Sequence, residues 1–473
     1  MVKKLIALLS CLLSFGVAAC TGKRSGVLGP GAKYIDWAGE KGAESQNAFF
    51  ISGWSAPPST SDAATNEKRF REVKDAGFNH INSLVDYHNA ALGNNSLAIR
   101  ALNAAGSAGI GYNVLDTGIR SLSPQLISSA VSAYKDMPAF YGHLVTDEPG
   151  IKDFDKIAAH YQKYKEILSD KNYYVNLLPT YASEEQLYHG AAGGVYTGAA
   201  ITYEDYVGQY ITKVKPSVIS YDHYPFREDA YGDRKLTETY LRNMEVISEK
   251  SGAAGLDFWL FIQAMSITPK TGTMKFPEPG YEDIRWQVFS SLVYGARGIQ
   301  YFCYWTPDDN TGEDFGDSMV DKNGEKTPIY GYVKDINTEI RSFEDIFFEF
   351  KWKGTIPHLP TGTATTQQVR NTVNGLKSAL TEHKRIASFS TERPLLIGAF
   401  EDAEGADGFL VMNYSQSDLK QDSTVNLKFN NAVKAVVCMG GERKVVTLTN
   451  GELKLELEAG QGAFVIPVGE KDK

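Results

Sequence analysis

The chain has 473 residues, with 48 Lys and Arg against 57 Asp and Glu, and a formal net charge of −9 at pH 7. This acidic balance and the lack of any run rich in Lys or Arg argue against nucleic acid as a partner, because phosphate binding needs a clustered basic surface. The length exceeds that of one ordinary domain and favours two.

Residues 1–20 predict an export signal that is not part of the fold. Lys3 and Lys4 precede an apolar run, residues 5–17, that is too short to span a bilayer. The run ends in small residues before Cys20, which resembles the lipobox of bacterial lipoproteins. That resemblance implies lipidation of Cys20 and an exported protein held on the cell envelope, at the outer membrane or a periplasmic face. An ordinary secretory signal is the alternative.

The segment after the signal, residues 21–45, begins with polar residues and is expected to be a flexible tether to the membrane. Only Cys303 and Cys438 then remain in the folded part of the chain. They are far apart and have no CxxC spacing, so we expect neither a disulfide framework nor a zinc or redox site.

Residues 46–390 predict a (β/α)₈ barrel. Short apolar runs alternate there with longer amphipathic stretches, which is typical of βα units and a parallel sheet. A doubly wound open sheet is the rival, but no Gly-rich phosphate turn follows any strand. The eight expected strands are 48–54, 78–85, 109–115, 140–146, 173–178, 217–224, 257–264 and 298–305, and the expected helices are 67–76, 97–108, 124–135, 154–169, 238–251 and 281–296.

Residues 393–473 predict a small antiparallel β-sandwich, because short alternating segments are separated there by turn residues. Asn450-Gly451 between 445–449 and 453–457 indicates a two-residue hairpin, since a type I′ turn needs positive φ at both positions. We expect a structural role for this domain, with a carbohydrate-binding module as the alternative.

Functional side chains in such barrels sit at the carboxyl ends of the strands. Carboxylates and aromatic residues dominate these positions, and they suit a sugar, whose C–H faces stack on rings while its hydroxyls bind carboxylates. The sequence has no G-x-S-x-G or H-E-x-x-H motif that would indicate a serine hydrolase or a zinc protease. The strand-end residues include Trp54, Asp86, His88, Asp116, Asp147, Glu148, Asp222, His223, Tyr224, Gln263, Tyr304 and Trp305.

Two segments resemble a known clan. Asp147-Glu148-Pro149 resembles the N-E-P that carries the acid/base in the retaining barrel glycosidases, which include family 42 β-galactosidases. Residues 285–305 resemble the segment from helix seven to strand eight of those enzymes and of their relatives in gut Bacteroidota. The resemblance implies a glycoside hydrolase with Glu148 as general acid/base, with His223 and Tyr224 as the strand-six pair and Trp305 under the sugar. It implies no organic cofactor.

One position departs from the clan, because Gln263 stands where a nucleophilic Glu ends strand seven and an amide cannot form a glycosyl ester. Three explanations stay open. Asp222 or Asp147 supplies the second carboxylate, with Glu278 and Asp309 behind them. Alternatively, the Asp147-Glu148 pair resembles that of hexosaminidases in which the substrate's acetamido group is the nucleophile. In the third, the protein binds surface glycans without cleaving them.

Structural interpretations stand beside these functional ones. Trp259 lies in mid-strand and is expected in the core, and the Asp147-Glu148 pair could bind backbone at a strand end. The acidic segment 308–321 is expected to be a solvated rim, because it lacks the spacing of a calcium loop. Taken together, the sequence predicts a carbohydrate-binding cleft with Glu148, Asp147 and Asp222 as catalytic candidates. Trp54, His223, Tyr224, Gln263, Tyr304 and Trp305 are the sugar-contacting candidates, and no metal is expected.

Overall fold

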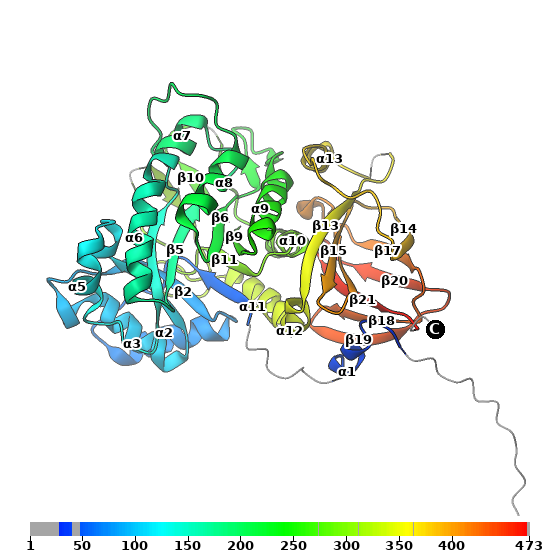
Figure 1. Cartoon of the computed structure of the whole chain (residues 1–473), viewed down its shortest axis with the longest axis horizontal. Helices are drawn as coiled ribbons and strands as arrows, with labels where there is room; N and C mark the ends of the chain where they lie inside the picture. The colour runs from blue at the N-terminus through cyan, green and yellow to red at the C-terminus, as the bar shows by residue number, and fades with distance from the viewer. Residues whose placement is uncertain (1–27, 40–47, 273, 311, 363, 471–473) are drawn as a thin grey trace, which may run out of the picture.

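The computed structural model describes residues 28–39 and 48–470, apart from residues 273, 311 and 363. It shows a barrel beside a pair of C-terminal sheets (Figure 1). The predicted export segment with Cys20 lies outside the described residues. Within the described part of the chain, no helix is both long enough and apolar enough to cross a membrane.

Eight parallel strands form the barrel, in the order β1-β11-β9-β6-β5-β4-β3-β2. The backbone N–H of Asn79 donates to the carbonyl of Ile51 (3.1 Å), and Ala56 N–H donates to Asn82 (3.0 Å), so the ends of the order meet. The predicted (β/α)₈ barrel is confirmed. Its strands are β1 (Phe50–Gly53), β2 (His80–His88), β3 (Gly111–Asp116), β4 (Phe140–Asp147), β5 (Asn172–Leu177), β6 (Val218–Asp222), β9 (Asp257–Gln263) and β11 (Gly298–Phe302).

Helices cover the outside of the barrel and follow the strands in sequence. The segment 97–108 forms the predicted helix because Ser96 caps its first turn and Gly109, at φ 66°, ends it in the left-handed conformation. The expected helix 124–135 instead divides into a 3₁₀ turn and a short helix. The helices are α2 (Ala63–Asp75), α3 (Leu97–Ala108), α4 (Thr117–Arg120), η2 (Pro124–Leu126), α5 (Ile127–Val131), α6 (Phe154–Ile167), α7 (Glu184–His189), α8 (Tyr203–Val214), α9 (Tyr240–Ala254), α10 (Tyr281–Val293) and α11 (Pro328–Arg341).

The carboxyl ends of the barrel strands define what we call the mouth, which faces upward in Figure 1, where α7 follows β5. Two short antiparallel pairs are added beside the mouth strands, β7 (Phe226–Glu228) with β8 (Arg234–Leu236) and β10 (Ile267–Pro269) with β12 (Glu313–Phe315). Inside the barrel, Trp259 stacks on Phe50 with ring centroids 3.7 Å apart and is buried, as expected of a core residue.

The C-terminal part is a sandwich of a six-stranded and a three-stranded antiparallel sheet. One face of the larger sheet packs on the smaller sheet, and its other face joins the core of the barrel. The larger sheet contains β13 (Phe350–His358), β15 (Leu395–Asp402), β16 (Asp407–Asn413), β21 (Gly462–Val468), β18 (Lys434–Met439) and β19 (Glu442–Thr447). The smaller one contains β14 (Ile386–Thr391), β17 (Ser423–Phe429) and β20 (Glu452–Leu457).

Two sequence-based boundaries need correction. Strands β13 and β14 precede residue 393 but pair within the C-terminal sheets, so these sheets begin at Phe350 and not at residue 393. Residues 28–38 are also not a free tether. Helix α1 (Lys33–Trp37) packs on the sandwich, where the buried Tyr34 donates its hydroxyl hydrogen to Asp402 (2.8 Å).

The predicted hairpin at Asn450-Gly451 is wrong in its pairing. Both residues have positive φ, 55° and 76°, as a type I′ turn requires. The flanking strands nevertheless diverge, because β19 pairs with β18 in one sheet and β20 pairs with β17 in the other. The turn therefore crosses between the sheets, which buries alternate residues of β20 in the sandwich core.

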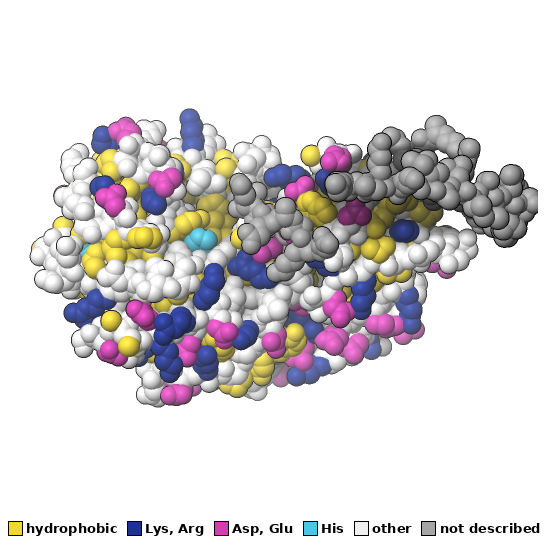
Figure 2. Space-filling view, turned by 90° about the horizontal axis from the view of Figure 1, so that it is seen from below, with side chains coloured by type: hydrophobic (Ala, Val, Ile, Leu, Met, Phe, Trp, Pro, Cys, Tyr) yellow, Lys and Arg dark blue, Asp and Glu magenta, His cyan; other side chains and the backbone are white. Residues whose placement is uncertain are grey.

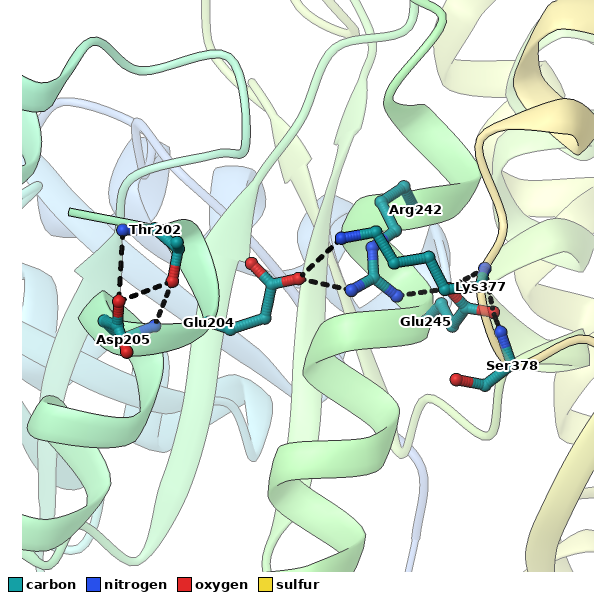
Figure 3. Close-up of polar contacts among 7 residues, drawn as sticks. All are labelled: Thr202, Glu204, Asp205, Arg242, Glu245, Lys377 and Ser378. Atoms are coloured by element: carbon teal, nitrogen blue, oxygen red, sulfur yellow. Dashed lines mark hydrogen bonds and ion pairs between the residues drawn. The ribbon is translucent and has the colours of Figure 1, made fainter. Parts of the chain in front are cut away.

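A polar cluster fastens the segment after α13 (Gln367–Asn374) to the outside of the barrel (Figure 3). Glu245 on α9 is buried and accepts from the backbone N–H groups of Lys377 (2.9 Å) and Ser378 (2.7 Å). Arg242, one turn before it, pairs with both Glu245 and Glu204. The buried carboxylate is thus fully compensated, as buried structural charges must be.

Candidate functional site

A hollow of about 250 Å³ opens at the mouth of the barrel. Its lining combines acidic and aromatic side chains, and none of the described residues that line it is Lys, Arg or His. The lining residues are Trp54, Asp147, Glu148, Asn176, Tyr181, Asp222, Tyr224, Phe261, Ile267, Phe276, Phe302 and Glu313.

Glu148 follows the last residue of β4 and lies in the left-handed region at φ 47°, which is rare for a residue with a side chain. Its backbone is held on both sides, since its N–H donates to the carbonyl of Asn176 (2.8 Å) and its carbonyl accepts from Ala191 (3.1 Å). Gly150 is needed just beyond it, because a Cβ there would lie 2.2 Å from the carbonyl oxygen of Tyr188. The local sequence therefore forces a tight strand exit that turns Glu148 into the hollow.

Asp147 and Asp222 share one hydrogen-bond donor. The side-chain Nδ2 of Asn176, at the end of β5, donates to Oδ1 of Asp222 at 2.9 Å and to Oδ1 of Asp147 at 3.3 Å. Asp222 is 8% exposed, whereas Asp147 is open to the hollow. Three carboxyl groups from the ends of β4 and β6 thus line one hollow, and they belong to the three catalytic candidates of the sequence, Asp147, Glu148 and Asp222.

The crowding of these acids favours their protonated forms. Burial, followed by the charges of Asp222, Asp147 and Glu313, holds the pKa of Glu148 well above its usual range. Burial and then the charge of Asp147 raise the pKa of Asp222, while the Asn176 hydrogen bond opposes this rise. Protein atoms surrounding Asp147 raise its pKa to about 6 even though its side chain opens to the hollow. The group therefore carries fewer negative charges at neutral pH than it has carboxyls.

Aromatic rings form the walls around the acids. Trp54 meets Phe261 edge to face with centroids 5.5 Å apart, and Tyr224 packs against Phe276 and Phe302 at 5.8 Å. Such rings can stack on the apolar faces of a sugar while the acids bind its hydroxyls. Two of the predicted sugar-contacting residues, Trp54 and Tyr224, are among these walls.

His223 does not reach the hollow, contrary to the sequence-based expectation. It is buried behind Tyr181, and its Nδ1 contacts Oδ1 of Asn243 at 2.9 Å. Burial lowers the pKa of His223 to about 3, so the ring is neutral at ordinary pH. Alternation along the chain explains the miss, because Asp222 and Tyr224 point into the hollow and the residue between them points away.

Gln263 is also turned away from the hollow. Its Nε2 donates to the carbonyl of Pro277 (2.9 Å), and its backbone exchanges hydrogen bonds with the side chain of Gln287. At this strand the side chain that lines the hollow is Phe261, two residues earlier. Gln263, expected to contact sugar, therefore does not line the hollow, and strand β9 presents no carboxylate to it.

Tyr304 and Trp305 lie outside the hollow as well. Tyr304 is 1% exposed and packs against Phe78, while the guanidinium group of Arg69 covers the ring of Trp305 at 4.6 Å. The chain leaves the barrel after Phe302, and this residue takes the position expected for Trp305. The segment after strand eight therefore keeps both rings out of the lining of the hollow.

Glu278 and Asp309, the further candidates for the second carboxylate, do not line the hollow, but a different rim acid does. Glu278 is exposed outside the hollow, and Asp309 pairs with Lys322 at 3.1 Å. Glu313 lines the hollow instead, because β12 pairs with β10 across the mouth. It belongs to the acidic segment expected to be a solvated rim, in which no sequence signal distinguishes it from its neighbours.

Two strands end in residues that form a separate buried network. His88 Nδ1 lies 2.7 Å from Oδ2 of Asp116, which also accepts from the hydroxyl of Tyr134 (2.9 Å). The same hydroxyl lies 2.7 Å from Nε2 of His143. His88, Asp116, Tyr134 and His143 are thus linked in one buried network outside the hollow, in which Nε2 of His88 has no hydrogen-bond partner among the described residues.

Sequence reasoning missed Asn176, although a signal for it existed. Asn172, Tyr174 and Asn176 alternate along β5, so all three face the barrel interior and the last of them is the strand-end residue. The expected strand extends to residue 178, beyond the observed end of β5 at Leu177, so Asn176 falls inside it. Phe261, Ile267, Phe276 and Phe302 carry no comparable signal, because apolar residues near strand ends are usually core.

No protein-family model matches the chain, and no curated protein matches it in sequence. Solved structures do resemble it. A glycoside hydrolase of family 5 from Bacteroides vulgatus is 13% identical, with a TM-score of 0.50 and 90% of each chain covered. A second structure, named a glycoside hydrolase, is also 13% identical, with a TM-score of 0.50 over 90% of this chain and 94% of its own. At this identity the likeness shows the fold, a barrel followed by a β-sandwich.

Proposed function

We propose that this protein hydrolyses O-glycosidic bonds of an oligo- or polysaccharide, with Glu148 as general acid/base. The observation that carries the proposal is the convergence of Glu148, Asp147 and Asp222 in one hollow walled by aromatic rings. The shared fold with two structures named as glycoside hydrolases supports it. Function depends on the site and not on the fold, so the main support for the proposal is the position of the three acids.

Glu148 has the protonation state that the first step requires. Because its pKa lies well above the usual range, its carboxyl group keeps its proton at neutral pH. It can then donate that proton to the leaving glycosidic oxygen as the bond to the anomeric carbon breaks. Once ionised, the same group can take a proton from the water that completes hydrolysis.

Glycoside hydrolysis needs a second catalytic group besides the general acid/base. We assign that role to Asp222 or Asp147, because strand β9 presents Phe261 to the hollow and no acid. Asp222 acts either as the nucleophile or as the base that activates water. In the substrate-assisted route, Asp147 orients an acetamido group of the sugar, whose carbonyl oxygen attacks the anomeric carbon. These routes differ in substrate, because only the last one requires an N-acetylhexosaminide.

A second candidate function is glycan binding without cleavage. The observation that favours it is that strand β9 ends in an amide and not a carboxylate, with Nε2 of Gln263 donating to the carbonyl of Pro277. Such a protein would bind sugar against the aromatic walls. Its acids would form hydrogen bonds with the sugar hydroxyl groups and would transfer no proton to a glycosidic bond.

The export prediction becomes part of the proposal. We propose that the chain is exported and anchored through lipidated Cys20, and that its similarity in motifs reaches the retaining clan that includes family 42 β-galactosidases. Expression of Cys20→Ala beside wild type tests the anchor, because the variant should leave the membrane fraction. A wild-type protein found unlipidated by mass spectrometry would contradict it.

The function is tested with a panel of aryl glycosides, N-acetylhexosaminides and polysaccharides. Wild type, Glu148→Gln and the control Glu278→Gln, an exposed acid outside the hollow, are compared on every substrate. We expect wild type and the control to turn over the same substrate and Glu148→Gln to lose about 10³-fold in kcat/KM. Turnover that survives in Glu148→Gln would remove Glu148 from the mechanism, and binding without turnover in all three would favour the second candidate.

A further inference from the structure

A chain of polar side chains crosses the interior of the barrel and ends at the candidate acids. It contains five amides and two hydroxyl groups, and each member is at least 93% buried. Five strands contribute to it, β5, β3, β2, β11 and β6. Its members, in order, are Asn172, Asn113, Asn82, Gln300, the hydroxyl pair Tyr174 and Ser220, and Asn176.

The first four members are linked amide to amide, with each nitrogen donating to the next oxygen. Nδ2 of Asn172 donates to Oδ1 of Asn113 (3.3 Å), whose own Nδ2 donates to Asn82 (2.7 Å). Nδ2 of Asn82 then donates to Oε1 of Gln300 at 2.9 Å. An amide side chain donates through its nitrogen and accepts through its oxygen, so the orientation of each amide in this series determines the orientation of the next one.

The hydroxyl pair passes the same direction on. Nε2 of Gln300 donates to Tyr174 (2.9 Å) and to Ser220 (3.1 Å). Each hydroxyl group therefore receives one hydrogen, and Oδ1 of Asn176 lies 3.4 Å from the hydroxyl of Tyr174 and 3.2 Å from that of Ser220. The two hydroxyl oxygens also lie 2.9 Å apart, so one hydroxyl donates to the other and the remaining hydroxyl hydrogen donates to Oδ1 of Asn176. With its oxygen occupied in this way, Asn176 must present its NH₂ group to the acids.

The last link explains why this direction matters. An ionised carboxylate only accepts hydrogen bonds, so an amide oxygen facing Asp147 and Asp222 would repel both. Hydrogen bonds that point in the same direction along a chain strengthen one another in a low-dielectric interior. A donor that is held in place favours the ionised form of the acid that it contacts. No such donor contacts the side chain of Glu148 among the described residues, so the chain acts on one pair of acids and not on the third.

We propose that Asn176 is a positioning residue, held by the one-way hydrogen-bond chain from Asn172, which keeps Asp147 and Asp222 as paired proton acceptors beside Glu148. The inference rests on the proposed function in so far as Glu148 donates a proton there. It assigns a use to the polar interior of the barrel, which elsewhere would be filled by apolar side chains.

Other charged groups near the pair are few. Glu148 and Glu313 share the hollow, while Arg120 and Arg227 act on the pair from outside its lining. Burial keeps the nearby tyrosines neutral by raising their pKa values, so they add no charge between pH 4 and 9. These are Tyr174, Tyr181, Tyr203, Tyr221 and Tyr224.

The test follows the titration of the two aspartates in the substrate-free protein by ¹³C NMR of carboxyl-labelled aspartate. Asp147→Asn and Asp222→Asn assign the signals. In Asn176→Leu we expect the pair to titrate about one pH unit higher, because the shared donor is gone. In Gln300→Met, which breaks the chain two links away, we expect about half that shift.

Asn337→Leu is the matched control. Asn337 is fully buried, accepts from the hydroxyl of Tyr301 (2.7 Å) and donates to the carbonyl of Ala76 (2.8 Å), but it does not belong to the hydrogen-bond chain that ends at Asn176. It should leave the titration unchanged. Circular dichroism checks that each variant folds, and Gln300→Met alone still decides the matter if Asn176→Leu does not.

An unchanged titration in Asn176→Leu or in Gln300→Met would overturn the proposal. The ascending limb of the pH profile of kcat/KM gives a second readout, which should move to higher pH in the same order of variants. Because the NMR titration needs no substrate, it separates the two proposals. A protein without glycosidase activity would still show the shift, and an active one could lack it.

Discussion

The acids at the barrel mouth and the charges at the junction with the sandwich follow opposite rules. At the junction every buried charge that we describe has a partner. Arg443 pairs with Asp345 and also donates to the carbonyls of Ser342 and Trp37, and Arg285 donates to Glu458 (2.7 Å) and to the carbonyl of Ala459. At the mouth, Asp147, Glu148, Asp222 and Glu313 line one hollow without a cation among its described lining residues.

On the face of the molecule seen from below, charges of both signs are interspersed (Figure 2). A fold that can pair its charges elsewhere has no structural need to crowd four acids. Unpaired acids with raised pKa values cost stability, and such costs concentrate where chemistry requires them. The contrast between the mouth and the junction is therefore the strongest physical indication of function in this molecule.

Replacing Asp222 should have the largest effect of the changes that we consider. Asp222→Asn removes the ionisable group while keeping its shape, and we expect kcat/KM to fall about 10³-fold on the substrate found in the panel. Steady-state kinetics measures this. Asp309→Asn, which changes a rim acid paired with Lys322, is the control and should keep wild-type turnover. Equal rates in both variants would show that the crowding of acids serves no chemistry.

Breaking a junction pair should cost stability and not activity. Arg443→Met leaves Asp345 without its partner in an environment where the two side chains are only 8% and 11% exposed. We expect the free energy of unfolding to fall by about 3 kcal/mol, as for other broken buried pairs. Urea denaturation measures the loss, and turnover per folded molecule should not change. An unaltered midpoint would mean that the junction tolerates unpaired charge as the mouth does.

Neutralising Glu148 should have the opposite effect on stability. The folded-state pKa of Glu148 lies above the unfolded value of about 4.3, so its contribution to stability is complete below pH 4 and is lost as pH rises toward the folded pKa. Glu148→Gln escapes this loss. We expect the variant to be more stable than wild type by about 1–2 kcal/mol at pH 8 and equal to it at pH 4.

Thermal or urea unfolding at the two pH values measures that difference. Glu278→Gln, an exposed acid, should leave stability unchanged at both. A Glu148→Gln variant less stable than wild type at pH 8 would mean that this acid is paired in a structural role.

The smallest effect is expected from the two tryptophans. Trp54 lines the hollow, whereas Trp305 lies outside it under Arg69. Trp54→Phe should raise KM about fivefold, because a smaller ring loses about 1 kcal/mol of contact with the sugar. Trp305→Phe should leave KM unchanged. The reverse order of effects would place the sugar on the other side of the strand-eight exit.

The barrel could be predicted because each parallel strand is a short apolar run flanked by a turn and a helix. All eight expected strands agree with the observed strands within a few residues, and the rule that functional side chains lie at strand ends identifies Asp147, Glu148 and Asp222. The sandwich is harder to predict from the sequence, because β13 pairs with β15 across a long intervening segment and no local pattern indicates this pairing. Asn450-Gly451 adopts the predicted turn, but pairing depends on which sheet has room for Leu453 and Leu455.

Residue order alone determined which strands form, which residues end them, and that an acidic Asp-Glu pair leaves strand four before a proline. Only the tertiary structure decided which of those ends face the hollow. It turned Gln263, His223, Tyr304 and Trp305 away and brought in Asn176, Phe302 and Glu313. The reason is physical. Strand periodicity is a local property of the backbone, whereas the direction of a side chain at a strand exit depends on the twist of the barrel and on partners from distant parts of the chain.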